Sequence, residues 1–311
     1  MKLEQLRTLV EIVRNNCSVS RAAAALGTPQ PALSRHLRSL ERELGVELFR
    51  RNPKRLLGLT EPGAAVVDVA RRILADTDSL AKIARDFSAR HHGTLTIATT
   101  HTQARHALPP VLQEFSRRFP HVELMLRQGT PEEIVELVRL GEADLSIGSS
   151  EPAGTGLVSF PCHLVQRIVL TPARHPLLKV KRLTLEALVR YPIITYDAPF
   201  IGRSRLVQAF RERGLAPRIV MSAIDTEVIK AYVERGLGIA IVAELAYDRR
   251  RDRTLRALDA SHLFAPNTIY LAVRRNDYLR EYVYDFIALY APQLTRQRVE
   301  EGRRSRVSRD S

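Results

Sequence analysis

The sequence predicts an α/β protein in two parts: an N-terminal winged helix-turn-helix with a long linker helix, and a C-terminal two-lobed α/β domain. Three observations predict this fold class. Two helical patterns separated by a glycine turn stand close together within residues 18–44. One amphipathic helical pattern then runs over residues 61–90. After it, strand and helix patterns alternate as far as residue 289, which is typical of α/β domains.

Length and composition indicate a protein of two or three domains with a buried core in each. The chain has 311 residues, of which 45% are hydrophobic and 26% charged. These are the values of a soluble globular protein. No apolar run is long enough to span a membrane, and the polar N-terminus lacks a signal-peptide core. We therefore expect a cytoplasmic protein with no membrane partner.

The number of cysteines and the net charge further restrict the class of protein. Cys17 and Cys162 are too few for a disulfide scaffold and lack metal-ligand spacing, so inert thiols are expected, with a redox switch as the alternative. The net charge is +14, and residues 1–90 hold 16 Lys and Arg against 10 Asp and Glu. A basic N-terminal segment fits a polyanionic partner, although surface cations can also serve only solubility.

The N-terminal segment begins with a helical pattern over residues 2–15, followed by the two helices of the predicted helix-turn-helix. Ser18 can cap the first of these, Gly27 permits the turn, and Thr28 with Pro29 can open the second. One face of the second helix is apolar, and the other carries groups suited to phosphates and base edges. The alternative is an ordinary core hairpin. The candidate DNA-binding residues of this helix are Gln30, Pro31, Ser34, Arg35 and Arg38.

A β-hairpin wing is predicted next, because short apolar strands at 46–49 and 56–60 flank a basic Asn-Pro tip. Its cations would meet the DNA backbone or minor groove, and the alternative is a solvated loop. The candidate DNA-binding residues here are Arg50, Arg51 and Lys54. The helix over 61–90 is too long and too amphipathic to stand alone, so we expect it to pair with its copy in a dimer.

A hinge is expected at 91–93, where the helical pattern stops and strand periodicity starts. Strands and helices then follow in turn. The expected strands are 94–99, 122–127, 144–148, 165–170, 193–196, 218–221, 238–242 and 268–273. The expected helices are 104–119, one that Thr130-Pro131 opens, 183–189, 203–213, 225–235 and 278–289.

Polar residues follow several of these strands, at the points where helices begin. Thr100, Thr102 and Gln103 follow the first strand, and Ser149 follows the third. Gly202 lies at the opening of a later helix. Neutral donors at helix starts suit a small oxyanion, because backbone amides and hydroxyls stabilise negative charge. The alternative is that each hydroxyl only caps its own helix.

These motifs resemble the LysR-type transcriptional regulators. The resemblance rests on the alanine-rich helix, turn and recognition helix over 20–37, on Leu44-Gly45-Val46-Glu47-Leu48-Phe49, and on Leu59-Thr60-Glu61-Pro62-Gly63. It implies a DNA-binding regulator of double-stranded promoter DNA with a periplasmic-binding-protein-like effector domain. It also implies self-association to a dimer or tetramer and contact with RNA polymerase.

Within this family, residues 97–109 and several later segments resemble the cysteine-regulon branch, CysB and Cbl. That resemblance implies control of sulfur assimilation and cysteine biosynthesis by acetylserine, sulfate or thiosulfate. The implied effector site comprises Thr100, Thr102, Gln103, Ser149, Ile201 and Gly202. Val165 and Ile201 replace a tryptophan and a threonine of the branch, which favours a bulkier or more apolar effector, such as an organosulfur compound.

The expected organisation follows from these segments. We expect a winged helix-turn-helix at 1–60, a linker and dimerisation helix at 61–90, an effector-binding domain at 91–295, and a disordered basic tail at 296–311. The first lobe would comprise about 93–161 and 268–295, and the second about 162–267. A solute-binding protein would explain the lobes but not residues 1–90. An enzyme is not expected, because no catalytic, cofactor or metal motif is present.

Overall fold

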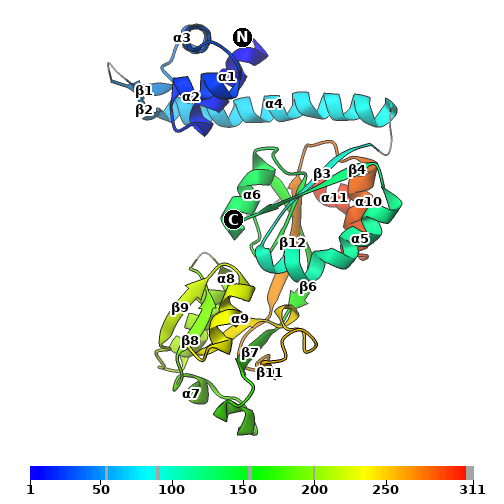
Figure 1. Ribbon diagram of the computed structural model, residues 1–311. Coiled ribbons are helices and arrows are strands. Elements are labelled where there is room, and N and C mark those ends of the chain that lie inside the picture. Colours follow the sequence, from blue (N-terminus) through cyan, green and yellow to red (C-terminus); the bar gives the residue numbers. More distant parts are fainter. Residues whose placement is uncertain (53–54, 89–91, 153–155, 199, 306–311) are drawn as a thin grey trace. The chain divides into compact units, whose positions relative to one another are not determined.

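The computed structural model describes residues 1–311 except 53–54, 89–91, 153–155, 199 and 306–311. The chain forms two compact units, Met1–Ser88 and Ala89–Ser311. The first unit contains three short helices, a hairpin and one long helix. Figure 1 shows these elements and the two lobes of the second unit. The prediction of an N-terminal helix-turn-helix and a two-lobed α/β domain is confirmed.

The first unit is built on three short helices, α1 (Leu3–Arg14), α2 (Val19–Ala25) and α3 (Gln30–Leu44). Leucines spaced three and four residues apart on α1 and α3 are buried, which is why both segments fold as amphipathic helices. The alanines of α2 allow close packing against both. The shared core contains Leu6, Leu9, Ile12, Ala22, Ala23, Leu33, Leu37 and Leu40.

The start of α3 differs by one residue from the expectation. Ser18 caps α2 by accepting a hydrogen bond from the Arg21 amide, as predicted. Thr28 does not cap α3, because its hydroxyl donates to the carbonyl of Leu26, and Pro29 occupies the N-cap position. Pro31 stands in the first turn, where its missing N–H has no intrahelical acceptor to lose.

The wing consists of β1 (Phe49–Arg51) and β2 (Leu56–Leu59), which pair antiparallel. Helix α4 (Glu61–Ser88) follows directly. The Thr60 hydroxyl accepts from the amide of Gly63 at its start. A Cβ on Gly63 would lie 2.0 Å from the carbonyl oxygen of Leu48, so only glycine allows α4 to begin this close to the wing.

Lobe I holds a five-stranded sheet in the order β4-β3-β5-β12-β6. Strands β3, β4 and β5 are parallel, and β12 pairs antiparallel with β5 and β6. The strand bounds are Gly93–Thr99 for β3, Val122–Gln128 for β4, Leu145–Gly148 for β5, Leu157–Val165 for β6 and Asn267–Arg274 for β12. The helical elements are η1 (Gln103–Ala107), α5 (Leu108–Arg118), α6 (Pro131–Arg139), α10 (Glu281–Tyr290) and α11 (Arg296–Arg304).

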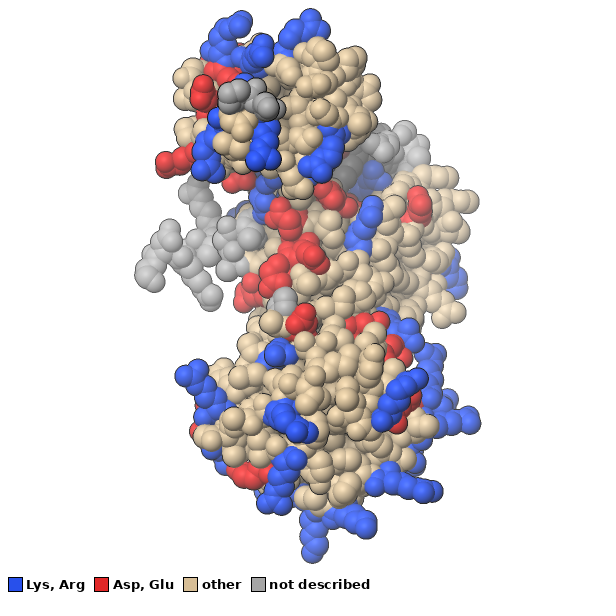
Figure 2. All heavy atoms as spheres, turned by 60° about the vertical axis from the view of Figure 1, so that its left-hand side comes forward, with Lys and Arg blue, Asp and Glu red and all other residues tan. Residues whose placement is uncertain are grey.

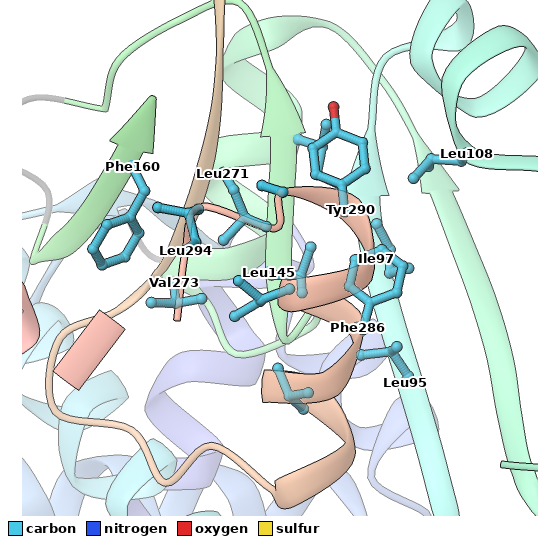
Figure 3. Packing of buried hydrophobic residues seen from close by; sticks show 14 of the residues in the cluster. Leu95, Ile97, Leu108, Leu145, Phe160, Leu271, Val273, Phe286, Tyr290 and Leu294 are labelled. Carbon is cyan, nitrogen blue, oxygen red and sulfur yellow. The ribbon is translucent and has the colours of Figure 1, made fainter. Parts of the chain in front are cut away.

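Alternation along β3 places helices on both faces of this sheet. Leu95 and Ile97 face a core shared with α5 and α10, whereas Ala98 faces the core shared with α6. Figure 3 shows side chains of β3, β5, β12 and α10 pointing toward one another in the first of these cores. The labelled set includes Leu95, Ile97, Leu145, Leu271, Val273, Phe286 and Tyr290.

Lobe II also contains a five-stranded sheet with helices on both faces, and its strand order is β11-β7-β10-β8-β9. One face packs on α7 and α8 and the other on α9, again through alternate strand residues. Its strands are β7 (Arg167–Pro172), β8 (Ile193–Tyr196), β9 (Ile219–Ala223), β10 (Ile239–Ala243) and β11 (Leu255–Asp259). Its helical elements are η2 (Pro176–Lys179), α7 (Leu185–Leu188), α8 (Ile201–Glu212), α9 (Thr226–Glu234) and η3 (Glu244–Ala246).

Hydrophobic periodicity predicted only part of the strands near the two crossovers between the lobes. The chain crosses from β6 to β7 at Gln166 and returns between β11 and β12. We expected one strand over 165–170, but β6 and β7 are separate strands in different sheets. Pro161 interrupts the apolar pattern of β6, beside a register shift between Ile269 and Tyr270 of β12. Strand β11 was missed altogether.

The expectation of a disordered tail over 296–311 is wrong for its first half. Residues Arg296–Arg304 form α11, capped by the Thr295 hydroxyl. Val299 is fully buried in the lobe I core, and Arg275 donates to the carbonyls of Arg303 and Ser305 at the end of the helix. One buried apolar side chain and capped ends stabilise a helix in which six of the nine residues are charged.

Candidate functional site

The recognition-helix candidates on α3 lie on one accessible surface. Gln30, Pro31, Arg35 and Arg38 are exposed and Ser34 is half-buried. On the opposite face, Leu33, Leu37 and Leu40 are buried, and Leu44 at the end of the helix is exposed. Within the described part of the chain, these side chains make no hydrogen bond or ion pair. Their donors and charges are therefore free to meet a ligand. Figure 2 shows Lys and Arg side chains spread over the first unit, at the top of the view.

The wing candidates divide into two kinds. Arg50 is exposed beside Gly58 of the paired strand. Arg51 instead forms an ion pair with Glu41 of α3, whose other oxygen accepts from the Leu48 amide at 3.0 Å. Glu41 thus connects the base of the wing to the recognition helix α3, and Arg51 helps to position the wing. Lys54 lies outside the described residues.

The candidates of the second unit gather around one cavity of about 50 Å³ between the lobes. Thr100, Thr102, Gln103, Ser149 and Gly202 line it, whereas Ile201, beside Gly202, does not. Strand register explains the convergence: Thr99 pairs with Ile147 in parallel strands, so the residues after both strands emerge at the same edge. The full lining is Thr100, Thr102, Gln103, Ser149, Val165, Arg167, Tyr196, Phe200, Gly202, Ala243, Asn267 and Ile269.

The polar side chains of this cavity are held by neighbours. The Gln103 amide oxygen accepts from the Tyr290 hydroxyl at 3.2 Å. The Thr102 and Thr226 hydroxyl oxygens lie 3.2 Å apart, and Thr226 lies 3.0 Å from the Tyr196 hydroxyl. Tyr196 also accepts from the Ala243 amide at 3.3 Å. The chain of hydroxyls joins lobe I to lobe II across one end of the cavity.

A second set of contacts between the lobes lies beside the first. Arg105 and His106 of lobe I reach Glu227 of lobe II at 3.2 and 3.5 Å. Glu227 also pairs with Lys230, which in turn pairs with Asp252. Burial, and then the charge of Lys230, lower the pKa of His106. At neutral pH the imidazole therefore remains uncharged, and Arg105 carries the charge of this contact.

Sequence reasoning missed the most unusual residue of the cavity, Arg167. It opens β7 directly after the crossover, and the residue is 6% exposed. The remaining unpredicted lining residues are apolar, aromatic or amide side chains from lobe II and the crossover strands. A charged residue at the first position of an otherwise buried strand, Arg167-Ile168-Val169-Leu170, was the one available signal.

Neither a metal site nor a membrane helix is found in the regions of the chain that the structure describes. No cluster of three or more His, Cys, Asp or Glu side chains is placed to hold a metal ion there. No helix in those regions is both long and apolar enough to cross a bilayer.

Comparison with known families matches both units. Residues 3–64 match the family described as "Bacterial regulatory helix-turn-helix protein, lysR family". Residues 88–295 match the "LysR substrate binding domain". The two matches together cover most of the chain.

Individual regulators are similar to this chain over most of its length. The chain is 46% identical over 295 residues to the HTH-type transcriptional regulator SsuR of Burkholderia cenocepacia, covering 94% of this chain and 96% of that one. It is 45% identical over 302 residues to CysB of the same organism, covering 97% and 96%. It is 44% identical over 290 residues to cbl of Escherichia coli, covering 93% and 92%.

Solved structures of other regulators match the fold of this chain. The cofactor-binding domain of the Cbl transcriptional regulator matches with a TM-score of 0.66 and 43% identity, over 69% of this chain and 95% of that one. Full-length OxyR from Pseudomonas aeruginosa matches with a TM-score of 0.73 over 95% of this chain and 98% of that one. At 23% identity, the latter shows the fold alone.

Proposed function

Because the chain belongs to the LysR family of transcriptional regulators and is related to CysB, Cbl and SsuR, we propose that it regulates sulfur-assimilation and cysteine-biosynthesis genes under the control of a small effector. The relatives are regulators and not enzymes. The helix-turn-helix also separates the chain from solute-binding proteins, which share only the two-lobed part. The proposed site of action is the cytoplasm, on promoter DNA and with RNA polymerase as partner.

The DNA-binding surface is proposed to comprise Gln30, Pro31, Ser34, Arg35, Arg38, Arg50 and Lys54. The exposed face of α3 would enter the major groove, where arginine and glutamine read base edges. The wing cations would meet phosphates and contribute affinity without sequence preference. Arg51 would act indirectly by holding the wing on α3.

A dimer is proposed to form through α4. Leu80 is 68% exposed and Val69 is 44% exposed on this helix, so the single chain leaves apolar surface in water. Pairing with a second copy would bury these side chains and place two recognition helices on successive half-sites. Pairing of second units would then give the tetramer.

The effector is proposed to bind in the cavity between the lobes. The hydroxyls of Thr100, Thr102 and Ser149 and the Gln103 amide are the groups that would hold the oxygen atoms of acetylserine, sulfate or thiosulfate. The single observation that carries this proposal is the convergence of these side chains on one cavity. Ile201 lies outside the lining and is given no contact.

A second candidate function uses the same site with an organosulfur effector. The favouring observation is that four apolar side chains, Val165, Phe200, Ala243 and Ile269, also line the cavity. A short alkyl group would lie against these side chains, where sulfate would place an oxygen without a donor. The corresponding regulon would serve the use of alkanesulfonates or sulfate esters.

Effector binding would act by changing the balance between open and closed lobes. A ligand shifts such a balance only as far as its affinities for the two states differ. The groups that line the cavity come from both lobes, so a guest gains most contacts in the closed state. Closure would alter how second units pair and thereby the spacing of the DNA-binding dimers.

Calorimetric titration of the full-length protein with sulfate, thiosulfate, N-acetylserine and ethanesulfonate tests the proposal. Saturable binding of at least one compound at one site per chain is expected. The binding compound should also change the affinity or footprint on DNA selected by the protein. Binding of none of the four would contradict the effector assignment.

A further inference from the structure

The side chain of Arg167 lines the cavity between the lobes and packs against Tyr196 and Gly202. The centre of its guanidinium group lies 5.7 Å from the ring centroid of Tyr196. On the other side is the first turn of α8: a Cβ on Gly202 would lie 2.1 Å from a terminal nitrogen of Arg167. The glycine therefore leaves the space that the guanidinium group occupies.

No anionic side chain in the part of the chain that the structure describes pairs with this arginine. Among the described residues, the Arg167 side chain has neither a hydrogen bond nor an ion pair. The nearby charge that acts on it is another cation, Arg205, whose own side chain donates to the Pro266 carbonyl and to Asn267. Burial is the main cause that lowers the pKa of Arg167; Tyr196 raises this pKa, and the charge of Arg205 lowers it further.

Comparable buried cations in the described chain do have partners. Lys230, 5% exposed, pairs with Glu227 and Asp252. Arg274, 9% exposed, pairs with Asp277 and donates to two backbone carbonyls. Proteins bury a charge at a high cost unless it is paired, so the exception at Arg167 calls for a partner from outside the chain.

We propose that Arg167 pairs with the negative charge of the effector, so that this site takes a small oxyanion and not a neutral ligand. The proposal rests on the proposed function, in which an effector enters this cavity. The hydroxyls of Thr100, Thr102 and Ser149 line the same space and would hold the remaining oxygens. An arginine supplies parallel donors as well as charge, which suits sulfonate, sulfate and carboxylate groups alike.

The size of the cavity limits the guest. Its volume is about 50 Å³. A single water molecule needs a cavity of about 10–15 Å³. A guest of a few heavy atoms, such as sulfate or methanesulfonate, fits the lobes as they stand. A guest the size of N-acetylserine requires them to open further.

An unpaired buried charge has a consequence for the free protein. Replacing Arg167 by methionine removes the charge and keeps much of the side-chain volume, so the ligand-free variant should be at least as stable as the wild type. We expect its melting temperature to be unchanged or raised by about 2–4 °C. A residue with a purely structural role would show the opposite change.

The test uses calorimetry and thermal melting on the full-length protein. The probes are sulfate, ethanesulfonate, N-acetylserine, methanesulfonate and dimethyl sulfone, the last two being a matched charged and neutral pair. The variants are Arg167→Met, Gly202→Ala, which displaces the guanidinium group without removing charge, and Arg211→Met, an exposed control on α8.

We expect the wild type and Arg211→Met to bind at least one anion and not dimethyl sulfone. Arg167→Met and Gly202→Ala should each weaken that binding about 10- to 100-fold. The anion that binds most tightly identifies the source of the oxyanion group. Should Arg167→Met bind as tightly as the wild type, or melt several degrees lower without ligand, this inference is wrong while the proposed function stands. Binding of no probe by the wild type would contradict both.

Discussion

The hydroxyl oxygens of Thr102 in lobe I and Thr226 in lobe II lie 3.2 Å apart. Thr102 also lines the cavity, so the same side chain can meet a guest and hold the lobes together. Under the proposed function, this double position would link ligand binding to lobe closure. The link is local and requires no contact with the DNA-binding unit.

Thr102→Val tests this link. The variant keeps the shape of the side chain but loses the hydroxyl, so effector affinity should fall about 3- to 10-fold. DNA binding without effector should not change. Calorimetry and gel shift on the same preparation measure the two properties. Thr94→Val is the matched control, because the Thr94 hydroxyl lies on β3 beside Glu123 and away from the cavity lining. Equal loss of both activities would reject the division of labour between the units.

Arg35 and Arg50 are expected to contribute to DNA binding in different ways. Arg35→Ala should relax sequence preference at one position and cost about 1–3 kcal/mol on the preferred sequence. Arg50→Ala should weaken all sequences alike and reduce the salt dependence by about one counterion. Binding to a set of single-base variants at several salt concentrations separates the two. Identical behaviour of both variants would contradict the assignment of α3 to bases and the wing to phosphates.

Glu41 should stabilise the wing. Glu41→Ala removes the acceptor of the Leu48 amide and the partner of Arg51, and we expect a loss of about 1–2 kcal/mol. Urea unfolding gives the free energy, and hydrogen exchange at the Leu48 amide reports the local change. Glu47→Ala is the control, since that side chain is exposed. An unchanged exchange rate at Leu48 would show that Glu41 does not hold the wing.

The dimer proposed through α4 should depend on Leu80. Leu80→Asp places a charge where apolar surface is expected to be buried, so the dimer should weaken at least tenfold. Sedimentation equilibrium measures the association, with Arg72→Asp as the control on an exposed position of the same helix. Unchanged association of Leu80→Asp would move the interface away from this part of α4.

The cysteines should be unreactive. Burial raises the pKa of Cys162 to about 11, and burial also raises the pKa of Cys17. A raised pKa leaves less thiolate at pH 8, so Cys162 should react with iodoacetamide roughly tenfold or more slowly than a free cysteine. The rate should rise as the pH approaches 11. Fast labelling at pH 8, or a change in DNA affinity after peroxide treatment, would support the redox-switch alternative instead.

Local patterns predicted most elements of this fold because their causes lie within a few residues. The leucine spacing of α3, the alanines of α2 and the alternation of apolar and polar residues in β3 each indicate which face is buried. The start of α3 was misplaced because Thr28 makes a competing bond to Leu26, which its residue type cannot reveal. Strand β11 and helix α11 depend on partners far along the chain, so periodicity missed them.

The candidate site was predictable in its polar half only. Thr100, Thr102, Gln103 and Ser149 follow strands that parallel register brings together, so their convergence could be expected. Arg167 could not, because its importance lies in the absence of a partner among the described residues, and only packing around Gly202 and Tyr196 makes that visible. Ile201 was named through its resemblance to a family position, and the structure leaves it outside the cavity.

The central claim is that one chain joins a DNA-reading helix to a cavity that senses a small anion. DNase footprinting of the full-length protein on its selected DNA, with and without the anion that binds in calorimetry, tests it most directly. We expect the anion to change the length or spacing of the footprint for the wild type and to leave it unchanged for Arg167→Met. An identical wild-type footprint at saturating anion would contradict the claim.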